Sequence, residues 1–581
     1  MASANEAVSG LLTEYAELLQ ITGGDPFRAR NYAKAARSVG GWSGDITSLD
    51  VKALKAIPGV GTSIAAKIAE YNETGTIAAL EDLRTKIPAG VRDLTRVPGL
   101  GPKRALLLSQ ELDVHDIDAL AEAVKAGKLN GLPGFGPKSE DRILHGIEVY
   151  RQGHDRVLLD VTLRTATTMV DHLKALPETQ RCAYAGSLRR WRETIGDVDI
   201  LAAADDSEPL MEVFRTLGEV IVSGPTKTSI RIPLSGGTHP PGPPLESIQA
   251  DLRVVKLDAW GAALQYFTGS QAHNVATRQI AVRKKLKLSE YGLFDAETDE
   301  LIVSRTEEEV YERLGLQWVP PAMREDRGEV EAAARGEIPQ LVRVKDLKGD
   351  LHTHTNLTDG VASLEDMIAA AAGKGYEYYA VTDHAPNLVM QRMTDEKMLA
   401  QRERLRALAG TTSMSLLHGT ELNIAPDGSV DWEEDFLAGF DVCVASVHSH
   451  FDQPREQMTR RFIRACENPR VHIIGHPTTR RLGKRGPVEV DFGELFRAAA
   501  RTGTALEINA SPQRLDLPSE HIRAARDAGV KFAIDSDAHS TVNLGNMPYG
   551  TGTAQRGWLT PEDVINTWPL ERLRAFLRKT P

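Results

Sequence analysis

Histidines and acidic residues with metal-ligand spacing are concentrated after residue 350, where ten of the sixteen histidines fall. His352 and His354 lie two apart in DLHTHT, so on a strand both side chains point to one face. Asp537 and His539 repeat that spacing in SDAH. A single buried histidine is more often a core residue than a ligand, but a whole series of candidates at strand ends is hard to explain that way. The nine candidates are His352, His354, Asp359, His384, Glu421, His448, His476, Asp537 and His539.

This ligand chemistry predicts a site that cuts phosphate esters. Imidazole nitrogens and carboxylates, without cysteine, favour Zn²⁺, Mn²⁺ or Fe²⁺ over Mg²⁺ alone. Several such ions can polarise a phosphoryl group and supply a hydroxide near neutral pH. We interpret three other histidines of this region, at 418, 450 and 472, as structural. Arg480 and Arg481, which follow HPTT, could guide a phosphodiester.

A second acidic cluster is predicted near residue 200. Asp197 and Asp199 alternate on one strand, so their carboxylates share a face, and Asp251 lies on another strand, QADLRVV. Three carboxylates suit two Mg²⁺ ions, which together serve an in-line displacement at phosphorus. Upstream, Gly186-Ser187 and Arg190 form a small basic turn able to cradle a triphosphate. An isolated Asp-x-Asp pair, however, is usually structural.

A third feature is a sequence motif that occurs three times, at 57–68, 97–108 and 132–143. Each copy has an apolar residue, Pro-Gly-x-Gly and then a predicted amphipathic helix. Closely spaced glycines let the backbone approach an anion, and a helix start offers free N–H groups. The repeated sequence resembles the helix-hairpin-helix motif, which grips DNA phosphates without reading bases. A glycine-closed helix turn is the alternative for one copy, but three copies favour DNA binding. The predicted DNA-binding residues are Gly59, Gly61, Gly99, Gly101, Lys103, Gly134, Gly136 and Lys138.

The elements that must position these residues divide the chain into several domains, because single cores rarely exceed ~250–300 residues. The first third predicts helices separated by glycine turns, and from about 157 strands and helices alternate. From 347, short buried strands end in histidines and acids, the layout of an α/β barrel. The net charge of −11 argues only weakly against a nucleic-acid partner, because local patches matter more. Three unpaired cysteines indicate a reducing interior, and no apolar run predicts a membrane span.

The motifs GSLRR…GDVDIL, QADLRV and YFTGS closely resemble the nucleotidyltransferase palm of family X DNA polymerases, the DNA polymerase beta group, over roughly residues 1–320. The resemblance implies that Asp197, Asp199 and Asp251 hold two Mg²⁺ or Mn²⁺ ions and that Asp251 deprotonates the primer 3′-hydroxyl. It further implies that the incoming nucleotide is bound by Gly186, Ser187, Arg190, Gly196, Tyr266 and Phe267, and that Asn274 and Arg278 touch the minor groove.

The same resemblance places Lys67 at the position of the family's lyase nucleophile, where a neutral amine can form a Schiff base with an abasic sugar. The family pins the 5′-phosphate with additional lysines, and this chain has Arg28 and Ser63 at two of those positions. A surface lysine on a DNA-facing helix is therefore the alternative interpretation.

The C-terminal motifs match the PHP family, the polymerase and histidinol phosphatase domain, over roughly 345–580. The family implies a distorted (β/α)7 barrel with three ions, Zn²⁺ and/or Mn²⁺. One site would use His352, His354, Glu421 and Asp537, a second Glu421, His448 and His476, and a third Asp359, His384 and His539.

Together these features predict a multidomain α+β and α/β protein resembling bacterial family X DNA polymerases with a PHP domain. The expected domains are an N-terminal helical unit (1–85), a helix-hairpin-helix region (86–155), the palm (156–260), a nucleotide-selecting subdomain (261–320), a linker with hinge motion (321–345) and the PHP domain (346–581). The expected function is gap filling in base-excision repair combined with a 3′–5′ exonuclease, with AP endonuclease or 3′-phosphatase action left open. Gapped or primer-template DNA and dNTPs would be the partners of a monomeric, cytoplasmic, nucleoid-associated bacterial enzyme. A small-molecule phosphatase and a non-catalytic repair scaffold are the alternatives.

Overall fold

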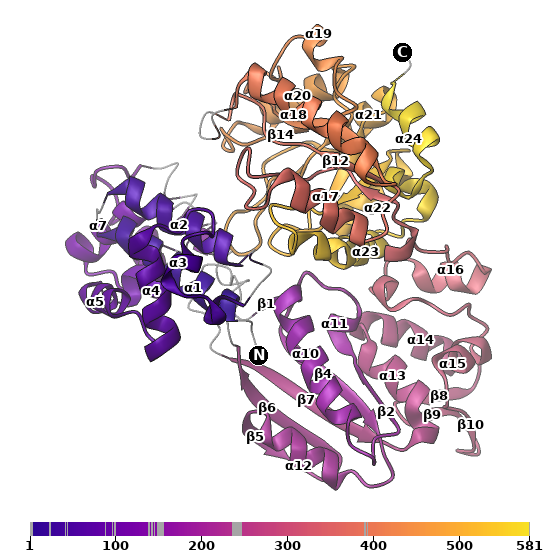
Figure 1. The fold of residues 1–581 in the computed structure, drawn as a ribbon. Helices are drawn as coiled ribbons and strands as arrows, with labels where there is room; N and C mark the ends of the chain where they lie inside the picture. The colour runs from indigo at the N-terminus through magenta and orange to yellow at the C-terminus, as the bar shows by residue number, and fades with distance from the viewer. Residues whose placement is uncertain are drawn as a thin grey trace.

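The computed structural model describes the chain except for residues 1–3, 23–24, 41, 43–44, 88, 96, 98–99, 137–139, 141–142, 145, 148–155, 235–246, 389–390, 392 and 580–581. Helices form the N-terminal region, a mixed sheet with its helices follows, and a parallel barrel ends the chain (Figure 1). The predicted fold class is confirmed by this order of elements.

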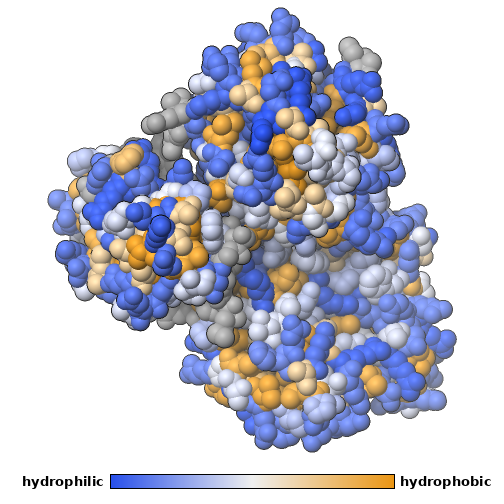
Figure 2. Space-filling view, viewed as in Figure 1, coloured by the Kyte–Doolittle hydropathy of each residue, from blue (hydrophilic) through white to orange (hydrophobic). Residues whose placement is uncertain are grey.

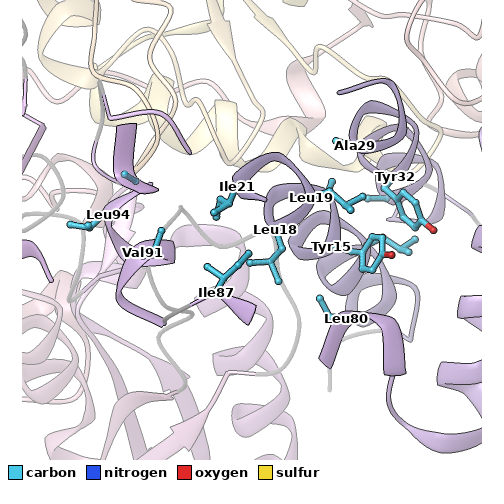
Figure 3. Close-up of a cluster of buried hydrophobic side chains, with 14 of the residues drawn as sticks. Tyr15, Leu18, Leu19, Ile21, Ala29, Tyr32, Leu80, Ile87, Val91 and Leu94 are labelled. Carbon is cyan, nitrogen blue, oxygen red and sulfur yellow. The ribbon is translucent and has the colours of Figure 1, made fainter. Parts of the chain in front are cut away.

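The N-terminal region is built from short helices around one apolar core. Its helices are α1 (Ala4–Ile21), α2 (Pro26–Gly40), α3 (Val51–Leu54), α4 (Thr62–Thr74), α5 (Ala78–Lys86), α6 (Ala89–Leu94), α7 (Pro102–Leu112) and α8 (Ile117–Lys125). Tyr15, Leu18 and Leu19 of α1 belong to this core together with Tyr32 of α2 and Leu80 of α5, and Tyr15 lies between the last two (Figure 3). One face of each amphipathic helix is thereby removed from water, which is the main stabilising contribution.

The glycines of the repeated Pro-Gly-x-Gly motif form the turns that precede the helices of the N-terminal region. Gly59 and Gly134 have φ of +81° and +84°, a left-handed backbone that side chains with a Cβ rarely adopt. Gly61 precedes α4, and Gly101 precedes α7, which starts with Pro102 at a position where a missing N–H costs nothing. Both glycine-led helix starts therefore present backbone N–H groups that no side chain of the cap residue occupies.

The palm is a five-stranded sheet in the order β2-β4-β7-β6-β5. The strands are β2 (Arg181–Tyr184), β4 (Asp197–Ala203), β5 (Glu219–Ser223), β6 (Lys227–Pro233) and β7 (Ser247–Val255), and the helices are α10 (Leu159–Lys174), α11 (Gly186–Arg189) and α12 (Glu208–Thr216). The short strands β1 (Val157–Leu158) and β3 (Thr194–Ile195) pair separately. The central pair β4 and β7 runs parallel, and its register places Asp199 directly opposite Asp251.

Residues 260–335 form a smaller unit beside the palm. It contains α13 (Trp260–Thr268), α14 (Gln271–Arg283), the antiparallel strands β8 (Leu286–Ser289), β9 (Gly292–Asp295) and β10 (Leu301–Val303), α15 (Glu307–Arg313) and α16 (Glu329–Arg335). Arg324 is fully buried and contacts Glu307 Oε1 at 2.6 Å, and Glu329 is fully buried against His273. The segment expected to be a linker, 321–345, is thus packed in part by buried ion pairs.

The C-terminal barrel has seven parallel strands in sequence order. They are β11 (Gly349–Asp350), β12 (Tyr378–Val381), β13 (Ser415–Asn423), β14 (Val442–Ser446), β15 (Ile473–Ile474), β16 (Ala505–Asn509) and β17 (Phe532–Asp535). A bridge between Thr353 and Ala538, just beyond β11 and β17, joins the first and last strands. The outer helices are α17 (Leu364–Gly373), α18 (Asp395–Leu408), α19 (Glu434–Leu437), α20 (Arg455–Glu467), α21 (Phe492–Thr502), α22 (Ser519–Asp527), α23 (Met547–Arg556) and α24 (Leu570–Leu577).

The palm and the barrel share apolar cores. Leu515 of the barrel belongs to the palm core, and Trp558 belongs to the core of the unit at 260–335. The visible surface is mostly hydrophilic with scattered apolar patches (Figure 2), and the exposed apolar residues include Val220, Ile221 and Val222 of the edge strand β5. None of the helices in the described residues is long and apolar enough to cross a membrane.

Candidate active sites in the barrel and the palm

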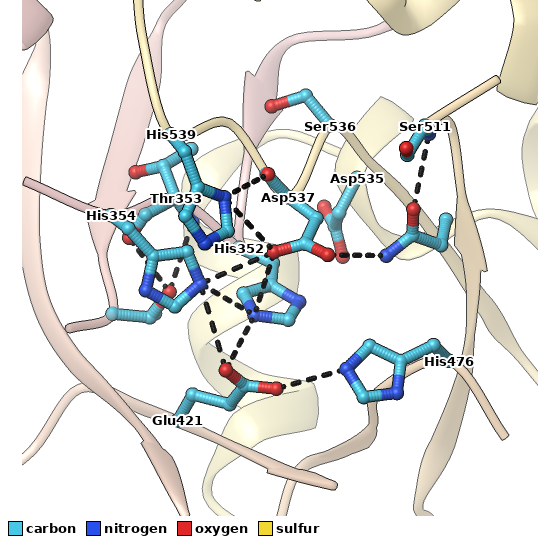
Figure 4. A network of polar contacts seen from close by, with 12 residues as sticks. His352, Thr353, His354, Glu421, His476, Ser511, Asp535, Ser536, Asp537 and His539 are labelled. Carbon is cyan, nitrogen blue, oxygen red and sulfur yellow. Dashed lines mark hydrogen bonds and ion pairs between the residues drawn. The ribbon is translucent and has the colours of Figure 1, made fainter. Parts of the chain in front are cut away.

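The barrel brings all nine predicted ligands together at the carboxyl ends of its strands. His352 and His354 follow β11, Glu421 lies on β13, His476 follows β15, and Asp537 follows β17. Figure 4 shows these side chains pointing at one another from different strands. Parallel strands all end at one edge, which is why residues almost 190 positions apart in the sequence converge here.

The first group of ligand atoms contains His352, His354 and Asp537. The two Nε2 atoms are 3.1 Å apart, and Nε2 of His354 lies 3.2 Å from Oδ1 of Asp537. Oε2 of Glu421 lies 3.5 Å from Nε2 of His352 and 3.6 Å from Nε2 of His354. These are the four residues assigned to one metal site by the family resemblance.

Glu421 also contacts the second group. Its Oε1 lies 3.1 Å from Nε2 of His476 and 3.2 Å from Nε2 of His448, and its Oε2 lies 2.9 Å from Nδ1 of His384. Atoms of His384, Glu421 and His448 lie within 4.8 Å of one another. The residues expected in the second set also meet here, because His448 and His476 both contact Oε1 of Glu421. The carboxylate of Glu421 is therefore shared between groups.

Asp359 organises the third group, which contains His354, His384 and His539 as well. Its Oδ1 lies 3.4 Å from Nε2 of His384, and its Oδ2 lies 3.3 Å from Nε2 of His539. This group matches the expected third set with His354 added.

The electrostatics of the barrel site favour positive charge. Burial lowers the pKa of His384, but the carboxylates of Glu421 and Asp359 outweigh burial and raise that pKa to about 10. Burial likewise lowers the pKa of His539, and Asp359 and Asp537 raise it to about 9. Burial raises the pKa of Glu421, yet its histidine neighbours hold the pKa well below the usual range. Buried carboxylates of this kind require cationic partners.

The residues present fit divalent metal ions. Donor atoms about 2.0–2.2 Å from one ion stand roughly 3–3.5 Å apart, which matches most of the separations above. Oδ1 of Asp359 is buried and accepts no hydrogen bond from any described residue. Imidazole and carboxylate donors without cysteine also match the ligand set predicted from the sequence.

Sequence reasoning missed a second layer of residues that hold the ligands. Oε1 of Glu507 lies 2.6 Å from Nδ1 of His352, and Oδ1 of Asn423 lies 2.7 Å from Nδ1 of His448. Nδ2 of Asn509 donates to Oδ2 of Asp537 at 3.0 Å. Asn423 ends β13 and Asn509 ends β16, a position by which the sequence could have indicated them, whereas Glu507 lies in the middle of β16.

Arginines around the barrel site have different environments. Arg514 was not anticipated, yet its Nε lies 3.7 Å from Oδ2 of Asp537 and its Nη1 is buried without a hydrogen-bond partner among the described residues. Arg480, expected to guide a phosphodiester, instead contacts Glu193 of the palm at 2.9 Å. The histidines at 418 and 472 are packed away from the ligands, with His418 stacked on Phe440 and His472 accepting from the backbone N–H of Cys443.

In the palm, the predicted carboxylates lie on neighbouring strands. Burial, together with the charges of Asp197 and Asp251, raises the pKa of Asp199 to about 7. Lys227 contacts Asp251 at 3.2 Å. The groups of three or more ligand atoms found within 4.8 Å of one another among the described residues are all in the barrel, so the palm carboxylates are spread more widely.

The predicted nucleotide-binding turn lies directly beside these carboxylates. A Cβ on Gly186 would stand 2.0 Å from Oδ2 of Asp199, so only glycine fits there, and its φ is +58°. Ser187 lies in the same turn, α11, and Gly196 directly precedes β4, where a Cβ would meet Arg156 Nη1 at 3.3 Å. Arg190 donates from Nε to Glu325 at 3.1 Å.

The other predicted nucleotide contacts lie on α13 and α14. The rings of Tyr266 and Phe267 meet edge to face, and the guanidinium of Arg278 lies 5.9 Å from the centre of the Tyr266 ring. Asn274, expected to touch the minor groove, is buried and hydrogen-bonded to Gln265 and to the Tyr266 carbonyl.

The first helix-hairpin-helix lines a pocket of about 660 Å³ whose wall includes Arg28, Tyr32, Lys55, Gly59 and Ser63. The amine of Lys67 lies 6.0 Å from the ring centre of Tyr32, a residue of this wall, and 5.6 Å from that of Tyr15. Lys103 is exposed on α7. The predicted contacts Gly99 and Lys138 lie outside the described residues.

Four family models match the chain. They are a helix-hairpin-helix domain (residues 3–77), a SAM-like helix-hairpin-helix tandem (91–148), the DNA polymerase beta thumb (263–325) and the PHP domain (350–511). The chain is also 36% identical over 575 residues to the DNA polymerase/3′-5′ exonuclease PolX of Bacillus subtilis (strain 168), with 98% of each protein covered. A stretch of 241 residues, 40% of the chain, is 30% identical to a probable phosphatase of Shewanella sediminis (strain HAW-EB3) and covers 93% of that protein, and 39% of the chain is 30% identical to the probable phosphatase YcdX of Escherichia coli (strain K12 / DH10B).

Fold and sites together define a class of protein in which helix-hairpin-helix segments and a polymerase beta-like core precede a PHP barrel. The chain belongs to the PolX family, the bacterial family X DNA polymerases with a C-terminal PHP domain. The family resemblance seen in the sequence is thereby confirmed.

Proposed function

We propose that this chain extends DNA primers at the palm and trims their 3′ ends at the barrel as a metal-dependent 3′–5′ exonuclease. The observation that carries the proposal is the presence of both acidic sites in one chain that aligns over 98% of its length with a DNA polymerase/3′-5′ exonuclease. Neither site alone would separate this function from that of a phosphatase or a scaffold.

At the palm, Asp197, Asp199 and Asp251 would hold two Mg²⁺ or Mn²⁺ ions. Asp251 lies opposite Asp199 in the strand register and would accept the proton of the primer 3′-hydroxyl. The turn from Gly186 to Arg190 would bind the triphosphate, since guanidinium donors match phosphate oxygens. Tyr266 and Phe267 would pack against the sugar, and Arg278 beside Tyr266 would approach the minor groove.

At the barrel, the nine ligands would hold three ions, Zn²⁺ and/or Mn²⁺, in the three groups described above. When bound, such ions supply Lewis acidity toward phosphoryl oxygens. Glu507 and Asn423 orient the imidazoles of His352 and His448 through their Nδ1 atoms. Nε of Arg514 lies 3.7 Å from Oδ2 of Asp537, and its Nη1, which has no hydrogen-bond partner among the described residues, would bind a phosphate oxygen of the strand being cut.

The biological role that follows is short-gap filling in base-excision repair. The glycine-led helix starts at 61 and 101 would grip the DNA backbone without reading sequence. The pocket with Arg28 and Ser63 would receive a 5′-phosphate, and Lys67 nearby is the candidate lyase nucleophile. We therefore infer that the enzyme acts at the bacterial nucleoid, where such a substrate would be found.

A second activity, 3′-phosphatase or AP endonuclease action at the barrel, has its own support. A stretch of 241 residues, about the length of the barrel, aligns with 93% of a probable phosphatase. A terminal phosphate and an internal phosphodiester present the same phosphoryl group to the ligand cluster, so one site can serve both reactions.

A 5′-phosphorylated one-nucleotide gap incubated with Mn²⁺ and dNTPs tests the proposal. The wild-type protein should both fill the gap and shorten an unpaired 3′ end. Asp199→Ala should lose filling and keep trimming, and His352→Ala should show the reverse. Unchanged extension by Asp199→Ala would refute the assignment of the palm, and turnover of small phosphate monoesters in preference to DNA would favour a metabolic phosphatase.

A further inference from the structure

The side chain of Arg190 is held by an ion pair that the barrel completes. Nε of Arg190 donates to Oε1 of Glu325 at 3.1 Å, and Nη1 donates to the carbonyl of Thr268 at 2.5 Å. Arg556, the last residue of α23 in the barrel, donates to the same oxygen of Glu325 at 2.8 Å. Its Nη1 also donates to the backbone carbonyl of Arg190 at 2.8 Å. One barrel guanidinium thus contacts both the main chain of Arg190 and the acid that orients the Arg190 side chain.

These groups are shielded from water, so a small change in their arrangement has a large effect on the strength of their ion pairs and hydrogen bonds. The side chains of Arg556, Glu325 and Arg190 are 4%, 13% and 12% exposed. Burial raises the pKa of Glu325, but Arg556, Arg190 and Arg192 together lower it below the usual range, so the carboxylate is ionised. Without Arg556, the carboxylate would attract Arg190 and Arg192 alone, and the Arg190 carbonyl would lose a buried donor.

A second contact ties the next palm residue to the same helix. A Cβ on Gly552 would stand 2.5 Å from Cδ2 of Trp191, so the indole lies directly on the backbone of α23. Trp191 has a φ of +57°, which sets the direction in which the chain leaves Arg190. Two consecutive palm residues, Arg190 and Trp191, therefore contact the same barrel helix, α23.

We propose that Arg556 is a positioning residue for the polymerase reaction: the barrel, through Arg556 and Glu325, sets the orientation in which Arg190 meets the incoming triphosphate. This inference rests on the proposed polymerase function and on Arg190 as a phosphate-binding residue. Arg556 touches no reacting atom, so its effect would be exerted through Glu325 and the Arg190 main chain. The barrel would then support nucleotide binding at the palm independently of its own phosphoesterase chemistry.

Steady-state gap filling at varied dNTP concentration by the full-length protein tests this role. Arg556→Met should raise the KM for dNTP roughly tenfold, with a smaller change in kcat, because a hydrogen-bonded charge that orients a phosphate-binding group is lost. Trimming of an unpaired 3′ end should stay within about twofold of wild type, since Arg556 lies outside the ligand cluster. Arg556→Lys should restore part of the affinity, because both acceptors are held by the one nitrogen Nη1, and a lysine ammonium carries three donors that can take its place on a differently shaped side chain.

A matched control is Glu520→Gln, which removes a peripheral contact between the barrel and Arg327 at 3.9 Å without touching Arg190. Its KM for dNTP should equal that of wild type. The effects of Arg556→Met and Glu325→Gln should also be strongly non-additive, because both remove one shared contact.

Three results would overturn the positioning role. They are an unchanged KM for dNTP in Arg556→Met, a parallel loss of filling and trimming with a lowered thermal midpoint, or additive effects of the Arg556 and Glu325 changes. Absence of extension by the wild-type protein would instead refute the polymerase function itself, so the two failures are distinguishable.

Discussion

Oε1 of Glu507 lies 2.6 Å from Nδ1 of His352, and both side chains are fully buried. This contact leaves Nε2 of His352 facing Glu421 and Asp537. Oε2 of Glu507 accepts a hydrogen bond from the backbone N–H of His476, so Glu507 holds two of the predicted ligands in place.

Replacing this acid should weaken the barrel site alone. Glu507→Gln is expected to lower 3′-end trimming, or the affinity for the activating ion, about 10- to 100-fold, because outer-shell partners orient metal-ligating histidines. Titration of exonuclease activity with Mn²⁺ measures the effect, and gap filling by the same preparation should be retained. Glu467→Gln, which removes only an exposed contact with Arg501, is the control. Equal trimming by both variants would contradict the orienting role.

Gly186 should be irreplaceable at the palm. A Cβ in Gly186→Ala would stand 2.0 Å from Oδ2 of Asp199 and would require alanine at a φ of +58°. Displacement of Asp199 should reduce gap filling by about 100-fold or more, since misplacement of a catalytic group by ~1 Å costs that much. Trimming at the barrel should persist.

The control for this change is Gly224→Ala, whose Cβ would meet its nearest atom, the Lys227 carbonyl oxygen, at an ordinary 3.5 Å. Full gap filling by Gly186→Ala would show that Asp199 can move without loss of function.

The decrease of the unfolding free energy at acidic pH should depend on Glu307. Burial raises the pKa of Glu307, but Arg324 and Arg189 outweigh burial and lower it to about 2. A carboxylate with a depressed folded-state pKa contributes stability above the unfolded-state value of about 4.3, and that contribution is lost as the pH falls toward the folded-state pKa. The contribution at neutral pH is on the order of 3 kcal/mol.

Urea unfolding of wild type and Glu307→Gln between pH 7 and pH 3 measures this contribution. The difference in unfolding free energy should be largest at pH 7 and should shrink below about pH 4.3. A difference that stays constant with pH would show that the ion pairs of Glu307 do not perturb its titration.

The helix-hairpin-helix segments should add salt-dependent affinity without sequence preference. Lys103→Ala is expected to weaken binding of gapped DNA of any sequence and to reduce the slope of log affinity against log salt by about 0.9, the value for one phosphate contact. Fluorescence anisotropy at several salt concentrations measures this slope. Lys86→Ala, an exposed lysine at the end of α5, should leave it unchanged, and an equal effect of both variants would indicate only a general charge effect.

The sequence by itself determined which residues could carry the chemistry. Histidines and acids at strand ends, and Asp197 and Asp199 two apart, are local patterns, because alternation and strand-end placement follow from backbone geometry alone. The family motifs then indicated the fold class, and all nine barrel ligands converge in the structure. The contact of His384 with the other oxygen of Glu421 could not be predicted, since it depends on side-chain directions around that carboxylate.

The surroundings of these residues depend on the folded chain and could not be predicted from local patterns. Glu507, Arg514 and Arg556 are of common types, and nothing in their local sequence separates them from exposed acids and arginines. Their roles arise from contacts across long stretches of chain, such as that of Arg556 with Arg190, 366 positions away. Arg480 illustrates the converse, because its neighbours in sequence indicated a phosphodiester while packing turned its guanidinium toward Glu193. Local geometry is set by neighbours along the chain, whereas charge pairing in a buried interface is set by whichever groups the fold brings within reach.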